Sequence, residues 1–369
     1  MSPRVFLIWL VVTLVTLVAA VAAVISQPEL SRVALVNEPA FPDLRARPDA
    51  VARIIVQSEG QSLTLSRGED GQWVAQDKYG YRASASAVRD VIVAMADMQL
   101  VEAKTTRPDR YPRLEVEDPD VEGAASRLVR LEDEGGTALA AAIIGKRSNR
   151  FTAGRDAGTY LRRPGEAQTW LATGALSLRE QIVDWLDKDI VHVASDAVRR
   201  VEITPLEGPA YSAVRDVADG ALRIEALPEG RVPKDSAASR LGAALAYLQF
   251  TDVMPRADLA LPEGRSRARI ETVDGLEVTA ELATVDGQIW ALFSARDLEP
   301  QGAVSDASET APDSNAPEAA GSGANETAPG KAAVINARVG VWAYRIEDHV
   351  AERLMAPLET LLEDRDGTS

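Results

Sequence analysis

Apolar and polar residues alternate along residues 51 to 75 in the manner of short antiparallel strands. Leu63 and Leu65 are separated by one polar residue, and Gly71-x-Trp73 marks a turn into a further strand. A helical pattern opens at Ser86, a residue type that often caps helices. Its apolar residues recur at helical spacing and form one face, made of Val88, Val91, Ile92, Met95 and Met98. We therefore predict a β-meander followed by an amphipathic helix.

The same order of elements recurs after Val198. Two strand-like stretches are followed by Ser236 and a second helical pattern, with its apolar face at Leu241, Ala244, Leu245 and Leu248. The segment MADMQLVEA (residues 95–103) aligns with LAYLQFTDV (residues 245–253) at the offset that also aligns Ser86 with Ser236. A repeat of this period indicates a domain duplication and excludes a solenoid.

Both copies close with a tryptophan-containing strand and a helical pattern, around Trp170 in the first and Trp342 in the second. We predict an α+β fold of two duplicated units, residues 51–197 and 198–363, each an antiparallel β-sheet with packed helices. The second unit is interrupted at about residues 299–333 by a stretch rich in Pro, Ala, Gly, Ser and acids that lacks aromatic residues. This composition predicts a disordered insertion.

A long apolar run precedes the predicted units. Val5 to Ile25 carries no charge, and as a helix it would span roughly 30 Å, the thickness of a bilayer core. We predict an uncleaved transmembrane anchor with a short cytoplasmic tail (residues 1–26) and a spacer at residues 27–50. The positions of Arg4 and Arg32 favour the main domain outside. The predicted location is the bacterial inner membrane, single pass, with the main domain in the periplasm.

Charge and cysteine content narrow the function classes. The chain has 369 residues, and its 56 acidic and 40 basic residues give a net charge of -16. A polyanion would be repelled over most of such a surface, which argues against a general nucleic-acid-binding protein but leaves a local basic patch open. The chain has no cysteine, which excludes disulfides, thiolate metal sites and a cysteine nucleophile.

Residues typical of catalytic sites are sparse. The two histidines, His192 and His349, show no metal-ligand spacing and are interpreted as structural or exposed. No nucleophile elbow, Walker loop or dinucleotide fingerprint is present. The acidic run from Glu115 to Glu122 is interpreted as a solvated loop. We therefore expect no enzyme activity and no cofactor.

One basic cluster stands out in this acidic chain. It falls within one predicted hairpin, and a contact with an anionic partner or with lipid phosphates is the functional interpretation. An exposed cluster of charges at strand ends, without a ligand, is the alternative. The residues of this cluster are Lys146, Arg147, Arg150, Arg155, Arg162 and Arg163.

Several short motifs resemble a bacterial family of unknown function, DUF4340. The resemblance covers residues 51–203 well and the second half weakly. Its motifs are a Gly-x-Trp turn, the end of a helix, a Gly-Lys pair, a Tyr-Leu-Arg strand and a closing Asp-Lys-Asp-Ile. They lie at Gly71–Trp73, Leu100–Glu102, Gly145–Lys146, Tyr160–Arg162 and Asp187–Ile190. The resemblance implies a membrane anchor and an association with ABC-type export systems, and it implies no catalytic residue.

These observations predict a non-enzymatic, membrane-anchored periplasmic accessory or scaffold protein. Its expected partners are the inner membrane, through Val5 to Ile25, and an ABC permease or auxiliary subunit. Two alternatives remain open: an envelope hydrolase that acts on cell-wall or glycan material, and a ligand-binding module between the two units. The sequence leaves the oligomeric state undefined.

Overall fold

The computed structural model describes residues 37–148, 158–174, 176–298 and 330–365. Contacts within the chain divide it into two units. The first comprises residues 1–77 and 83–180, and the second comprises residues 78–82 and 181–369.

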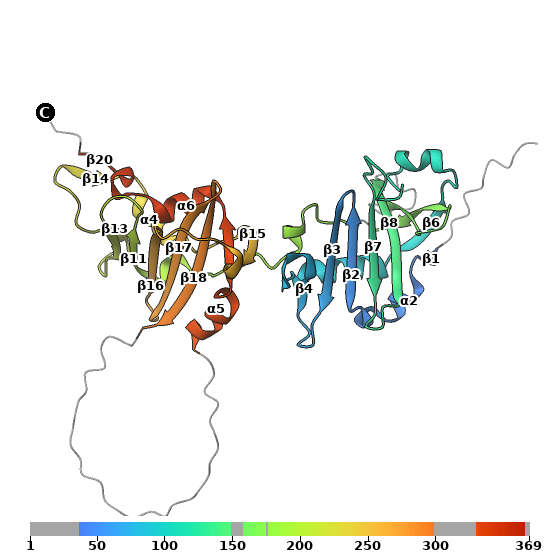
Figure 1. The fold of residues 1–369 in the computed structure, drawn as a ribbon, viewed down its shortest axis with the longest axis horizontal. Helices are drawn as coiled ribbons and strands as arrows, with labels where there is room; N and C mark the ends of the chain where they lie inside the picture. The colour runs from blue at the N-terminus through green and yellow to red at the C-terminus, as the bar shows by residue number, and fades with distance from the viewer. Residues whose placement is uncertain (1–36, 149–157, 175, 299–329, 366–369) are drawn as a thin grey trace, which may run out of the picture. The chain divides into compact units, whose positions relative to one another are not determined.

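The first unit is built on one antiparallel sheet. Its strands follow the order β1-β6-β10-β9-β8-β7-β2-β3-β4, and Figure 1 shows β3, β2, β7 and β8 side by side. Apolar side chains alternate along these strands, so Ile54 and Val56 of β2 are buried while Gln57 is exposed. The strands are β1 (Glu38–Pro39), β2 (Arg53–Ser58), β3 (Gln61–Arg67), β4 (Trp73–Ala75), β6 (Gln99–Ala103), β7 (Arg127–Glu132), β8 (Ala138–Ser148), β9 (Gly158–Arg162) and β10 (Thr169–Thr173).

Two α-helices accompany this sheet, α2 (Pro42–Ala46) and α3 (Ala85–Ala96). The cap of α3 is Ser84, whose hydroxyl accepts a hydrogen bond from the Ala87 N–H at 3.3 Å, and not the predicted Ser86. Three residues of the predicted apolar face are buried in this helix: Val88, Val91 and Met95. Met98 is also buried, although the helix has ended two residues earlier.

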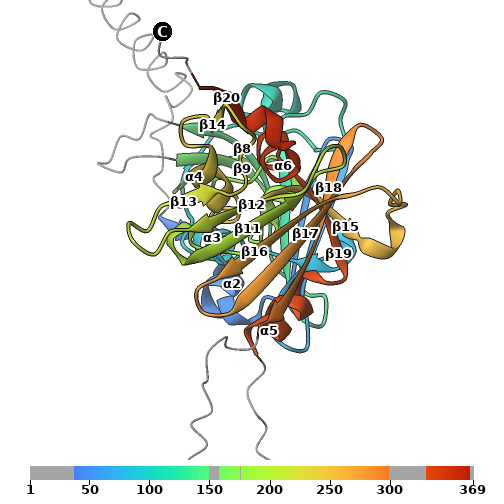
Figure 2. The same cartoon turned by 90° about the vertical axis from the view of Figure 1, so that its left-hand side faces the viewer.

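The second unit contains an antiparallel sheet in the order β13-β12-β11-β16-β17-β18-β19-β15 and a two-stranded sheet of β14 and β20. Figure 2 shows β11, β16, β17 and β18 side by side. The strands of these two sheets are β11 (Val198–Thr204), β12 (Tyr211–Arg215), β13 (Leu222–Ile224), β14 (Arg231–Pro233), β15 (Phe250–Pro255), β16 (Ser266–Thr272), β17 (Leu276–Val285), β18 (Gln288–Asp297), β19 (Trp342–Ile346) and β20 (Leu362–Asp364). The segment 78–82 of this unit also contains β5 (Tyr81–Arg82), which belongs to neither of these two sheets.

Three short α-helices accompany these sheets: α4 (Ala237–Gly242), α5 (Lys331–Val339) and α6 (Asp348–Met355). Helix α4 ends at Gly242, where a Cβ atom would lie 3.1 Å from Leu222 Cδ2 on β13. A glycine allows this close packing on the strand but disfavours continuation of the helix by about 1 kcal/mol. Leu245 and Leu248, on the predicted helical face, are buried after the helix has ended.

An aromatic cluster lies in the core of the second unit. Tyr81, from the segment 78–82, places its ring 4.9 Å from that of Trp342 and 5.3 Å from that of Phe250. Tyr344 joins the cluster, and burial raises the pKa values of both tyrosines above the usual range. A short piece of chain that precedes α3 in the sequence therefore belongs to the core of the second unit.

The predicted fold class is wrong. The described residues form mostly antiparallel β-sheets with few helices, and not two duplicated α+β units with packed helices. Helix α4 has six residues where α3 has 12, and the helix predicted after Trp170 is a 3-10 turn at Ile182–Trp185. Apolar residues three and four apart are buried against a sheet whether or not their backbone is helical, which explains the error.

The two units share an order of strands but differ in their helices. The order β6-β10-β9-β8-β7-β2-β3-β4 in the first sheet corresponds strand by strand to the order β15-β19-β18-β17-β16-β11-β12-β13 in the second. The helices that should repeat differ in length and capping: Ser84 caps α3, whereas the Ser236 hydroxyl donates to the Asp235 carbonyl and leaves α4 without a side-chain cap. The structure therefore does not support an internal duplication of the predicted unit.

The predicted membrane location is also corrected. Over the residues that the structure describes, no helix is long and apolar enough to cross a membrane. The prediction of a single-pass inner-membrane protein therefore has no transmembrane helix to support it in the described part of the chain. The segment on which it rested, Val5 to Ile25, lies outside the described residues.

Most of the predicted insertion, residues 299–329, likewise lies outside the described residues, whereas residues 331–333 belong to α5. The predicted spacer contains described structure from residue 37 onward, namely β1, α2 and a 3-10 turn at Pro48–Ala50.

Candidate functional site

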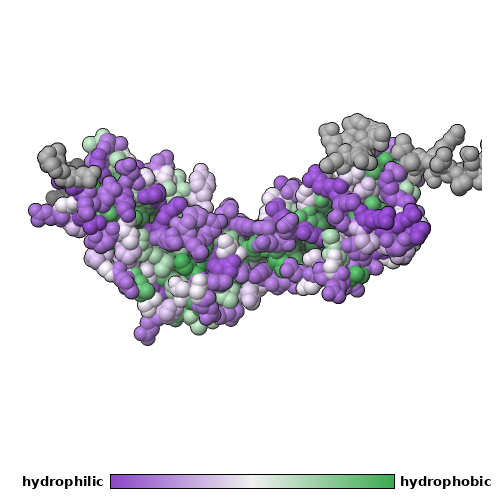
Figure 3. Space-filling model, turned by 90° about the horizontal axis from the view of Figure 1, so that it is seen from above, coloured by the Kyte–Doolittle hydropathy of each residue, from purple (hydrophilic) through white to green (hydrophobic). Residues whose placement is uncertain are grey.

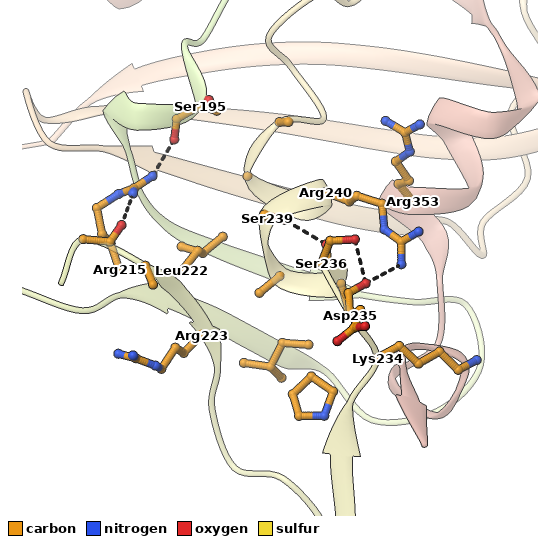
Figure 4. A pocket seen from close by; sticks show the side chains of 18 of the residues that line it. Ser195, Arg215, Leu222, Arg223, Lys234, Asp235, Ser236, Ser239, Arg240 and Arg353 are labelled. Carbon is orange, nitrogen blue, oxygen red and sulfur yellow. Dashed lines mark hydrogen bonds between the residues drawn. The ribbon is translucent and has the colours of Figure 1, made fainter. Parts of the chain in front are cut away.

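A groove of about 970 Å³ lies at the β13 end of the second unit. Its walls come from β13, β14, α4 and α6, together with the turns that flank them. Figure 2 shows α4 beside β13, and the lining side chains appear in Figure 4.

Five cationic side chains line this groove, against two acidic ones, Asp196 and Asp235. An excess of positive charge is unusual for a chain of net charge -16, so the groove is a local exception on an acidic surface. The cations are Arg215, Arg223, Lys234, Arg240 and Arg353.

Backbone carbonyl groups hold two of the cations in place. The guanidinium of Arg215, at the end of β12, donates to the carbonyls of Val198 (2.6 Å) and Ser195 (2.5 Å). Lys234 Nζ donates to the carbonyl of Thr360 at 2.9 Å. Because carbonyl groups are neutral partners, both side chains keep their full positive charge while their positions are constrained.

The other three cations differ in their partners. Arg223 forms ion pairs with Asp216 and Asp219, and the Ala221 N–H together with this arginine lowers the pKa of Asp219. Arg240 makes one long contact, 3.4 Å, to the Asp235 carbonyl. The side chain of Arg353 has no hydrogen bond or ion pair within the described part of the chain. Arg240 and Arg353 are therefore the cations most available to a ligand.

Apolar side chains complete the lining. Ile224 and Ala237 are buried, Leu222 is half-buried, and Leu227 is 38% exposed. Figure 3 shows a mostly hydrophilic surface on which hydrophobic residues form only small areas. A groove that combines apolar contacts with free cations can bind an anionic ligand that also carries apolar groups.

The structure separates the residues of the predicted basic cluster. Lys146 and Arg147, near the end of β8, are exposed. Arg150 and Arg155 lie outside the described residues. Arg163 is half-buried and donates to the Ala40 carbonyl at 2.9 Å.

Arg162 is buried and makes its contacts within the first unit. Its residue is 4% exposed, and its guanidinium donates to the Val116 carbonyl at 2.9 Å and to Asp118 Oδ1 at 2.6 Å. The same group lies 4.8 Å above the Tyr111 ring. These contacts tie the loop after residue 113 to β9, so the four basic residues that the structure describes do not form one exposed patch.

The two histidines considered from the sequence have different neighbours. His349 is exposed and lies 3.0 Å from Glu347, and the ring of His192 lies 5.9 Å from that of Tyr247. Within the described ranges, no group of three or more His, Asp or Glu side chains is placed to hold a metal ion.

Sequence reasoning missed the groove. Its cations are spread from Arg215 to Arg353, and no stretch of the chain concentrates them. The one local signal is the segment VPKDSAASRLG (residues 232–242), which contributes Lys234 and Arg240 in the otherwise acidic second half.

The Gly-Lys pair at the end of β8 has a packing explanation. A Cβ atom on Gly145 would lie 2.3 Å from the Leu114 carbonyl oxygen and 2.6 Å from Val116 Cγ1. The Lys146 N–H donates to the same Leu114 carbonyl at 3.1 Å, which fixes this backbone in place. Only glycine permits this approach of the loop to the strand.

We expect Gly145→Ala to destabilise the first unit by about 1–3 kcal/mol, because a backbone atom must move to admit the methyl group. Thermal unfolding followed by circular dichroism measures the effect. Gly135→Ala, in the turn between β7 and β8, is the matched control, since its Cβ atom would meet only Asp133 Oδ1 at 3.4 Å. Equal melting temperatures for the two variants would contradict the packing explanation.

Comparison with known proteins gives one family. The model of a domain of unknown function, DUF4340, matches residues 73–263, more than half of the chain. The match begins in β4 of the first unit and ends between β15 and β16 of the second. No curated protein and no solved structure matches the chain.

Proposed function

The chain belongs to the DUF4340 family, and from this premise we propose that it is a non-enzymatic accessory protein that binds another protein. The observation that carries the proposal is the groove of the second unit, in which cations and apolar side chains share one surface. Charge complementarity at such a surface provides specificity and accelerates association.

The class of partner comes from the family resemblance. Its motifs imply an association with ABC-type export systems, so we propose that the partner is a permease, ATPase or auxiliary subunit of such a transporter. In this role the protein contributes a binding surface, and the transporter contributes the chemistry. The match covers β13, β14 and α4, so these walls of the groove lie within the family's region.

Site-specific photo-crosslinking in the native host tests this proposal. A photoreactive amino acid at Leu227, on the groove, is expected to yield an adduct that mass spectrometry identifies as a transporter subunit. Val121, an exposed apolar residue of the first unit at 51% against 38% for Leu227, is the matched control and should yield no such adduct. The proposal fails if the Leu227 position gives no transporter adduct.

A further inference from the structure

We propose that the groove binds an acidic segment of the partner protein in an extended conformation, as a strand added to the free edge of β13. The inference rests on the proposed function and specifies how the partner is recognised.

Strand β13 is the terminal strand of its sheet, and among the described strands it pairs only with β12. Two backbone hydrogen bonds flank the pairing, from the Glu225 N–H to the Ser212 carbonyl and from the Asp216 N–H to the Ala221 carbonyl, each 2.8 Å. Antiparallel pairing alternates, so residues 221, 223 and 225 direct their backbone groups to β12. The backbone groups of Leu222 and Ile224 therefore point to the free edge.

This edge faces the groove. Leu222, Arg223 and Ile224 all line it, and β14 contributes Pro233 to the lining. A proline has no N–H to donate, so β14 is a poor template for an added strand. The geometry thus favours β13 as the strand to which an extended segment would add.

The cations of the groove favour an acidic segment as the ligand. Figure 4 shows Arg215 and Arg223 on one side of Leu222, and Lys234, Arg240 and Arg353 on the other. An acidic segment would be repelled by most of a chain of net charge -16, so this groove is where it can approach. Because Arg223 is paired with Asp216 and Asp219, the cations left for an anion are Arg215 on one side of Leu222 and Lys234, Arg240 and Arg353 on the other. Such a distribution fits an elongated anion better than a single small one.

The test uses the purified full chain and a fluorescent synthetic peptide of alternating glutamate and valine, with binding followed by fluorescence anisotropy. The expected result is saturable binding that weakens with salt. The same peptide with alternate backbone nitrogens methylated keeps its charge but cannot form the strand hydrogen bonds, and we expect its affinity to fall by about tenfold or more. Equal affinity for both peptides overturns strand addition.

Two pairs of variants locate the site. The double variant Arg240→Glu/Arg353→Glu is expected to weaken binding of the unmodified peptide by about tenfold or more. The control is the double variant Arg89→Glu/Arg113→Glu, which makes the same charge change on exposed arginines of the first unit and should leave binding unchanged. Leu222→Pro removes an outward N–H without removing a bond to β12 and should weaken binding more than Leu222→Ala. Indistinguishable effects within either pair overturn the assignment of the site.

Sedimentation of the unliganded chain tests whether a second copy of the chain binds in the groove. If the chain self-associates and Arg240→Glu with Arg353→Glu abolishes the association, the groove binds another copy and the proposal is overturned. The peptide test and the crosslinking test fail independently. Loss of peptide binding with an intact transporter adduct refutes only the binding mode, and the reverse result refutes the partner.

Discussion

Met95→Asp is expected to unfold the first unit, whereas Val93→Asp in the same helix leaves it folded. Met95 is 0% exposed and Val93 is 50% exposed, although only one residue separates them on α3. The substitution at Met95 loses about 1.5–3 kcal/mol of apolar burial and also places a carboxylate where it has no water. The sum is comparable to the whole stability of a domain, about 5–15 kcal/mol.

The second unit offers the same comparison. Leu245 is 1% exposed and Tyr247 is 90% exposed, so Leu245→Asp should unfold this unit and Tyr247→Asp should not. Calorimetry of each variant, with proteolytic fragments assigned by mass spectrometry, shows which unit has lost its transition. A folded first unit in Met95→Asp, or a folded second unit in Leu245→Asp, would contradict the described cores.

Arg162→Glu is expected to lower the stability of the first unit by about 3–5 kcal/mol, because it replaces a buried, fully bonded guanidinium by an unpaired carboxylate. The variant loses the donors to Val116 and to Asp118, and it leaves a like charge beside Asp118. In a unit of this size the melting temperature should fall by about 10 °C.

Lys146→Glu with Arg147→Glu is the matched control, drawn from the same predicted basic cluster. Both side chains are exposed on β8, and substitutions at such positions change stability by about 0.5 kcal/mol or less. Thermal unfolding of the three proteins separates the two roles. If Arg162→Glu had the same melting temperature as the wild-type protein, Arg162 would behave like an exposed surface charge, and the interpretation of its contacts would be wrong.

Some of the fold could be predicted because its signals are local. The turn at Gly71 leads into β4 at Trp73, and Gly71 has the positive φ of 77° that favours glycine there. The buried face of α3 follows from the spacing of Val88, Val91 and Met95. Such patterns depend only on the helical and strand periods, which the order of residues specifies directly.

The remaining features depend on parts of the chain that are distant in sequence. Tyr81 lies next to α3 in the sequence, yet its ring packs against Trp342 and Phe250. Helix α4 ends at Gly242, which packs closely against Leu222 of β13, and no pattern within α4 indicates that neighbour. Leu245 is buried although it follows the end of α4, so its burial does not depend on a helical backbone.

The sequence by itself determined the acidic balance of the chain, the absence of cysteine, the family motifs and the spacing of apolar residues. Only the tertiary structure decided that Arg162 is buried while Lys146 is exposed, although both come from one basic cluster. It also decided that Arg215 and Arg353 line one groove. Burial and proximity arise from which strands become neighbours, and that pairing brings together residues whose separation along the chain carries no local signal.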